Sequence, residues 1–183
     1  RTFREAIALD ERQATLHADL SSVLMAQAAG ENLEAPGEPE KERQQALARE
    51  ALEALRRTAQ LDSALPRLFT RMGAIYEVLE QPDDARIAFE QALRHDPGDA
   101  DASYALGSLL LSRRQATEAL PLLETAVQLE PFAVPYRLSL AGAYAALERR
   151  KEAERELNLI DRLAPGLPQV TELRAILARA KKK

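Results

Sequence analysis

The chain has 183 residues, which suits one ordinary domain or one short repeat array. Aromatic residues make up only 4% and charged residues 30%, with Ala, Leu, Glu, Arg and Gln abundant, so the composition predicts long helices and almost no strand. The net charge of −4, with both signs interspersed, argues against a nucleic-acid partner. The absence of cysteine excludes thiol catalysis, disulfides and thiolate metal sites.

The first part of the chain predicts helices interrupted by an insertion. Residues 3–10 and about 12–30 are each expected to be helical. An acidic insertion with Pro36 and Pro39 follows at about 31–40, and it is longer than the turns elsewhere. A further helix is expected at about 40–61. Because the chain starts within a helix pair and nothing caps that end, we expect the natural protein to extend upstream of Arg1.

The rest of the chain repeats with a period of 34 residues, marked first by Pro97, Pro131 and Pro165, each of which closes a helical segment. The other positions that keep this step are Ala85, Ala119 and Ala153, Gly73 and Gly107 (then Ala141), Tyr76 and Tyr144 (with Leu110 between), and Ala92 and Ala126. The period therefore predicts three helical hairpins, at 66–99, 100–133 and 134–167.

Small residues in these units have a steric purpose. Gly73 and Gly107 remove side-chain bulk where the two helices of a hairpin cross. We expect Phe89, Leu123 and Leu157 to fill the gap toward the neighbouring hairpin.

The last segment predicts a capping helix at about 167–180. It carries Val170, Leu173, Ile176 and Leu177 on one side and polar residues on the other. A repeat array needs such a terminal element, because its last apolar face is otherwise exposed to water.

This pattern resembles the tetratricopeptide repeat (TPR), whose units carry Trp-x2-Leu-Gly-x2-Tyr, then Ala-x3-Phe, then Pro. The unit 66–99 matches best, with Phe69 in the Trp place, followed by Met72, Gly73, Tyr76, Ala85, Phe89 and Pro97. Ser103 and Arg137 stand in the Trp place of the next two units, which depart from the pattern there. The resemblance implies an all-α fold, a right-handed α-solenoid of antiparallel hairpins with about ten helices forming a superhelix. It makes 1–65 partial and divergent units and 168–183 a C-terminal cap.

The resemblance also implies a binding surface, because the first helices of TPR units line a concave groove. The candidate partner-binding residues are Arg67, Thr70, Arg71, Glu77, Asp101, Tyr104, Ser108, Leu111 and Leu138, and further inward places hold Ser139 and Gly142. Arg67 and Arg71 are expected to bind a carboxylate of a peptide or helix. Tyr104 and Leu138 are expected to anchor it through apolar contact. In the alternative interpretation, the two arginines are solvated or paired with Glu77 and Asp101.

One specialised use of the groove is not supported. Some TPR proteins clamp the C-terminal carboxylate of chaperones, and Arg67 and Arg71 stand at two of the places that such a clamp uses. Asp19, however, stands where the clamp needs Asn, with Ala18 and Ser22 nearby.

No pattern in the sequence predicts catalysis. His17 and His95 are the only histidines, they have no metal-ligand spacing, and packing roles explain both better. Neither a nucleophile elbow nor a phosphate- or dinucleotide-binding loop is present. We therefore expect no catalytic residue, no metal site and no cofactor.

The sequence therefore predicts a protein-interaction scaffold whose partner is a protein or peptide. Two alternatives stay open: a self-assembling structural unit, and an accessory region of a larger enzyme or secretion or assembly complex. No apolar run approaches the length needed to cross a bilayer, which predicts a soluble segment. Usage rich in Ala and Arg favours a bacterial source but does not separate cytoplasm from periplasm.

Overall fold

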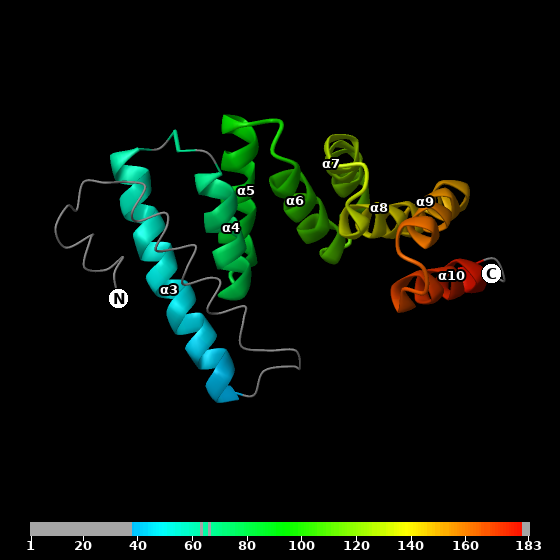
Figure 1. Cartoon of the computed structure of the whole chain (residues 1–183), viewed down its shortest axis with the longest axis horizontal. Coiled ribbons are helices and arrows are strands. Elements are labelled where there is room, and N and C mark those ends of the chain that lie inside the picture. The colour runs from blue at the N-terminus through cyan, green and yellow to red at the C-terminus, as the bar shows by residue number, and fades with distance from the viewer. Residues whose placement is uncertain (1–37, 63, 66, 181–183) are drawn as a thin grey trace. The chain divides into compact units, whose positions relative to one another are not determined.

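The computed structural model describes residues 38–62, 64–65 and 67–180. This part of the chain is helical and contains no strand (Figure 1). Its eight helices are α3 (Glu38–Leu61), α4 (Leu68–Val78), α5 (Pro82–His95), α6 (Ala100–Ser112), α7 (Ala116–Leu129), α8 (Val134–Ala146), α9 (Arg150–Leu163) and α10 (Pro168–Ala180). The expected total of about ten included helices at 3–10 and 12–30, which lie outside the described residues, as do His17 and residues 31–37 of the insertion. Residues 38–40, also assigned to the insertion, belong to α3.

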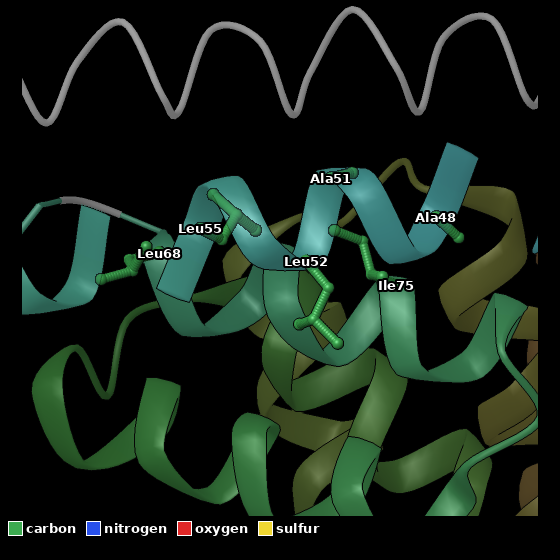
Figure 2. Close-up of a cluster of buried hydrophobic side chains, with 6 residues drawn as sticks. All are labelled: Ala48, Ala51, Leu52, Leu55, Leu68 and Ile75. Atoms are coloured by element: carbon green, nitrogen blue, oxygen red, sulfur yellow. The ribbon is translucent and has the colours of Figure 1, made fainter. Parts of the chain in front are cut away.

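The chain divides into two compact units, residues 1–95 and 96–183. In the first unit α3, α4 and α5 lie side by side (Figure 1). Figure 2 shows the core between α3 and α4, which contains Ala48, Ala51, Leu52 and Leu55 from α3 and Leu68 and Ile75 from α4. Ala48, Ala51 and Leu55 are completely buried. The alanines add little side-chain bulk to this cluster, and the larger side chains exclude water from it.

The hairpins of both units use one kind of turn between their two helices. Glu80, Arg114 and Glu148 follow the first helix of successive hairpins, and all three have left-handed φ values, 56°, 63° and 59°. At the first turn, Glu80 donates its N–H to the Glu77 carbonyl (3.0 Å), and Gln81 donates to the Tyr76 carbonyl (2.8 Å). This pair of bonds is a Schellman motif, and it recurs at the other two turns. The hydrogen bonds therefore fix the turn even though no glycine occupies it.

Gly73 and Gly107 occupy equivalent helix crossings. A Cβ atom at Gly73 would lie 2.4 Å from the Phe89 ring, and one at Gly107 would lie 2.7 Å from Leu123 Cγ. Phe89 and Leu123 thus pack on the glycine of their own hairpin, whereas the sequence had suggested the gap toward the neighbouring hairpin. Ala141 stands at the same place in the third hairpin and is completely buried.

Replacing Gly73 with Ala should destabilise the protein. The clash with Phe89 resembles overpacking of a core, which costs about 1–3 kcal/mol, and the better helix propensity of Ala recovers about 1 kcal/mol. Because a 2.4 Å contact is shorter than real Cβ contacts, we expect a cost of about 2–3 kcal/mol, in the upper part of that range, and hence a net loss of about 1–2 kcal/mol in urea unfolding followed by circular dichroism. The double variant Gly73→Ala/Phe89→Leu should recover part of the loss, since the third hairpin has this combination at the equivalent places, Ala141 and Leu157, and both are buried in one cluster. Equal stability of Gly73→Ala and the parent would contradict this account of the crossing.

In the hairpin of α8 and α9, Arg137 stands where the repeat pattern has its first aromatic residue, and it forms a buried ion pair. Arg137 on α8 is only 8% exposed. Its Nη1 lies 2.5 Å from Glu156 Oε2 on α9, and its Nε donates to the Pro131 carbonyl at 2.6 Å. The guanidinium is therefore paired and hydrogen-bonded inside the hairpin, as a buried charge must be. This contact joins α8 to α9 and to the turn before α8.

Removing Arg137 should cost far more than removing an exposed arginine. Arg137→Ala leaves Glu156 largely buried without its counter-charge, and we expect a loss of about 3–5 kcal/mol in unfolding free energy. The matched control is Arg86→Ala, because the pair Arg86–Glu90 (2.8 Å) is substantially exposed and should contribute less than about 1 kcal/mol. Similar losses in the two variants would show that the Arg137 pair is not stabilising.

Tyrosine hydroxyls tie first helices to the preceding hairpin in both units. Tyr144 on α8 donates to Glu124 Oε1 on α7 at 2.8 Å, and Arg56 on α3 donates to the Tyr76 hydroxyl on α4 at 3.4 Å. Each pair is separated by 20 residues, so the two contacts are equivalent in the repeat. Burial, helped by the bond to Glu124, raises the pKa of Tyr144 to about 12. The Tyr144 bond therefore persists throughout the neutral range.

The last helix, α10, docks on α8 and α9. Val170 and Leu177 are buried in a cluster shared with Ala141 and α9. Arg174 binds three α9 side chains, Asp161 (2.7 Å), Asn158 (2.8 Å) and Glu154 (3.5 Å). Ile176, expected on the apolar side, is instead 56% exposed.

Candidate partner-binding face

Two first helices of the second unit, α6 and α8, contact each other and bring several candidate residues together. At one end of the contact, the rings of Tyr104 and Tyr136 are stacked, with centroids 4.5 Å apart and planes at 20°. The Tyr136 hydroxyl donates to Asp101 Oδ1. An aromatic surface therefore lies next to a carboxylate that already accepts a hydrogen bond.

The middle of the contact is polar and the other end is apolar. Ser108 Oγ and Ser139 Oγ are hydrogen-bonded at 3.1 Å, and both residues are half-buried. Further along, Leu111 lies beside the backbone of Gly142. We call this surface the α6–α8 seam; it consists of Asp101, Tyr104, Ser108, Leu111, Tyr136, Ser139 and Gly142.

Leu138 was expected to anchor a partner, and part of its surface is already used inside the protein. It is half-buried and packs against the cluster of Ala141, Ala153 and Leu157. What remains for a partner is therefore only part of the side chain.

The other four candidates lie in the first unit, on or just before α4. Arg67 precedes α4 with a left-handed φ of 59°. Thr70 is only 7% exposed, which leaves little of it for a partner. Arg71 is exposed, and its side chain forms no hydrogen bond or ion pair with the other described residues of the first unit, so the alternative of a pair with Glu77 does not apply to it.

The carboxyl group of Glu77 has a shifted pKa. Neighbouring atoms partly enclose its carboxyl group, and this desolvation raises its pKa, although the residue keeps an exposed surface. The raised pKa means that the ionised carboxylate disfavours the folded state. A contact with a cationic group of a partner would oppose this effect.

The stability of Glu77→Gln should depend on pH. Since the pKa of Glu77 is raised in the folded protein, ionisation opposes folding above that pKa and has no effect below the ordinary pKa of about 4.3. Glu77→Gln should therefore raise the melting temperature at pH 7, and the gain should vanish as the pH falls below about 4. Thermal unfolding at several pH values measures the difference. A gain that is the same at both ends of the range would contradict a pKa effect.

Sequence reasoning did not single out Tyr136, and it named Ser139 and Gly142 only as further inward places. Tyr136 is buried and is not at an inward place of the repeat pattern, so only the fold shows its contact with Tyr104. Ser139 and Gly142 stood at inward places, but neither residue type is a common anchor. His95, expected to face the next hairpin, stacks on Phe69 of its own hairpin at 4.9 Å.

Nowhere in 38–62, 64–65 and 67–180 do three or more His, Asp or Glu side chains form a group that could hold a metal ion. Among the helices α3 to α10, none combines the length and apolar character that a membrane span requires.

Hairpins that repeat every 34 residues, with equivalent glycine crossings and equivalent turns, define a helical-repeat protein. The sequence pattern of the tetratricopeptide repeat matches residues 71–134, and a second pattern of the same repeat matches residues 110–177. Together these matches cover more than half of the chain. The chain belongs to the tetratricopeptide repeat family.

Solved structures with the same fold share little sequence with this chain. YrrB, described as "a TPR protein with an unusual peptide-binding site", superposes with a TM-score of 0.78 at 22% identity, over 100% of this chain and 84% of YrrB. MamA from Desulfovibrio magneticus RS-1 gives 0.73 at 23% identity, over 92% and 85% of the two chains. The first TPR of Spaghetti (RPAP3), bound to the HSP90 peptide SRMEEVD, gives 0.60 at 21% identity, over 67% and 97%. No curated protein matches the sequence significantly.

Proposed function

We propose that this protein is a non-catalytic scaffold that binds a peptide or helix of a partner protein on its first helices. The observation that carries the proposal is the α6–α8 seam, where aromatic, hydroxyl and apolar groups remain accessible between two packed helices. Two proteins with the same fold, YrrB and Spaghetti, are described with a peptide-binding site and a bound peptide, which supports the proposal.

The seam has the composition of a binding surface rather than of a core. Tyr104, Ser108, Leu111 and Ser139 are half-buried, whereas Leu106, which points into the hairpin from the same helix, is buried. The flat Tyr104 ring, held by its stack on Tyr136, offers a rigid contact area that loses little entropy on binding.

The first unit offers a polar contact of its own at Arg71. Its exposed guanidinium can donate two parallel hydrogen bonds to a carboxylate. On the first unit we expect affinity to depend on a partner carboxylate at Arg71, and on the second unit we expect it to depend on an apolar side chain at Tyr104.

The double variant Arg71→Ala/Tyr104→Ala should weaken partner binding. Truncation of Arg and Tyr anchors typically costs about 1–2 kcal/mol each, so partners recovered from the native source should bind about 30-fold or more weakly in titration calorimetry. The matched control is Arg94→Ala/Gln128→Ala, which removes exposed side chains from the second helices α5 and α7. If every recovered partner bound the Arg71/Tyr104 variant as tightly as the parent, the first-helix assignment would be wrong.

Self-assembly is a second candidate, favoured by two exposed apolar side chains. Phe132 is 79% exposed in the turn between α7 and α8, and Ile176 is 56% exposed on α10. Large apolar side chains in water often mark contact surfaces. Light scattering decides this case: association should appear between micromolar and near-millimolar concentration, and a monomer throughout that range would count against it. The full-length sequence would show whether the chain is an accessory region of a larger enzyme or secretion complex.

A further inference from the structure

The turns inside the hairpins of the second unit lie on one edge of that unit. The α6–α7 turn and the α8–α9 turn occupy equivalent places of the repeat, and α6 contacts α8. The last turn of α10 lies at the same edge, because Arg150 in the first turn of α9 donates from Nη1 to the Leu177 carbonyl at 3.1 Å. We call the segments 112–119, 146–153 and 177–180 the hairpin-turn edge. It shares no residue with the α6–α8 seam.

Basic residues are concentrated on the hairpin-turn edge. Between residues 96 and 180, six of the ten Lys and Arg residues lie on it, compared with three of the twelve Asp and Glu residues. The edge is therefore positive, whereas the rest of the second unit is negative. The sequence continues from the end of α10 with three further lysines, at 181–183. The six basic residues of the edge are all exposed, and they are Arg113, Arg114, Arg149, Arg150, Lys151 and Arg179.

Two of the three acidic residues of the edge already have partners. Glu152 is paired with Arg149 at 3.0 Å, and Glu118 accepts a hydrogen bond from Gln115 at 3.0 Å. Half of the basic side chains, in contrast, form no hydrogen bond or ion pair with the other described residues of the second unit. These are the side chains of Arg114, Lys151 and Arg179.

Helix stability does not account for basic residues in these places. Arg150 and Lys151 stand in the first turn of α9, where free N–H groups carry partial positive charge and a carboxylate is the stabilising group. In the first unit, the equivalent turn of α5 carries Asp83 and Asp84. The two bases therefore slightly oppose formation of α9, and a contact with a negative surface outside the fold gives a physical reason for them.

The arrangement of the charges fits a flat anionic surface. The basic residues lie at the ends of neighbouring helices, so one plane can meet several of them together, whereas a bound peptide runs along a groove between helices. Each Lys or Arg near an anionic bilayer adds to the attraction, and clusters of about four to eight such residues are typical of lipid-binding surfaces. The negative remainder of the unit is repelled by the same bilayer, which favours the orientation with this edge toward it.

We infer that the hairpin-turn edge binds the surface of a membrane that contains anionic lipids. Its guanidinium and ammonium groups pair with the phosphates of the lipid headgroups. The contact is electrostatic and requires no segment that crosses the bilayer. Because helix ends meet the membrane, the α6–α8 seam stays open to a partner protein. The inference goes beyond the proposed function and does not depend on it.

The test is co-sedimentation of the 183-residue chain with vesicles of phosphatidylglycerol and phosphatidylcholine in equal amounts. At about 0.1 M salt we expect binding to these vesicles and none to vesicles of phosphatidylcholine alone. Binding should be lost at about 1 M salt, where the Debye length falls to about 3 Å. Absence of binding to the anionic vesicles at low salt, or equal binding to both kinds of vesicle, overturns the inference.

Variants of the edge give the second measurement. Arg114→Asn/Lys151→Gln should bind the anionic vesicles about ten- to thirtyfold more weakly, because each cation contributes a factor of about five. Its melting temperature should not fall, since Asn tolerates the left-handed φ of 63° at position 114 and the loss of Lys151 favours the start of α9. The matched control is Arg94→Gln/Arg162→Gln, which removes two exposed charges from the last turns of α5 and α9 and should leave vesicle binding unchanged.

Three results would contradict the inference. Equal weakening by the edge variant and by the control would show that net charge, not this edge, determines binding. If replacement of the three lysines at 181–183 with Gln abolishes binding while Arg114→Asn/Lys151→Gln leaves it intact, the attraction belongs to those lysines alone. If a polyglutamate peptide or a DNA duplex binds and loses affinity in the edge variant, while anionic vesicles do not bind, the edge recognises another polyanion and not a membrane.

Discussion

The structure depends on how closely the two helices of each hairpin approach. Gly73 under Phe89 and Gly107 under Leu123 leave no room for even one additional carbon atom. This close approach determines how the second helix of each of these hairpins packs against the first. Because the same contact recurs, a local steric constraint gives the chain its period.

Features that follow from this constraint could be predicted from the sequence. The all-α fold and the repeat were readable because Gly, Ala and Pro recur where helices cross or end, and the family matches confirm the tetratricopeptide repeat. The last helix was readable for a related reason, since Val170 and Leu177 show helical spacing and both are buried.

Features that depend on particular side-chain partners could not be predicted. Arg137 stands where the family has an aromatic residue, and only the fold reveals that Glu156 on α9 neutralises it. Thr70 matched an exposed place of the pattern yet is buried, and Tyr136 matched none yet holds the Tyr104 ring. Periodicity reports the backbone position of a residue, whereas its exposure and partners depend on neighbours one hairpin away.

The hydrogen bonds that Tyr76 and Tyr144 form with the preceding helix affect how the order of repeats in such a chain can change. Tyr144 donates to the carboxylate of Glu124, whereas Tyr76 accepts from the guanidinium of Arg56 at the equivalent place. A phenol hydroxyl can donate or accept a hydrogen bond. A repeat with Tyr at this place can therefore follow a repeat whose second helix carries either an acid or a base at the facing position. A lysine in place of the tyrosine could only donate to an acid, and a glutamate could only accept from a base. A tyrosine at this contact therefore permits a repeat to be duplicated or moved without a matching substitution in the repeat that precedes it.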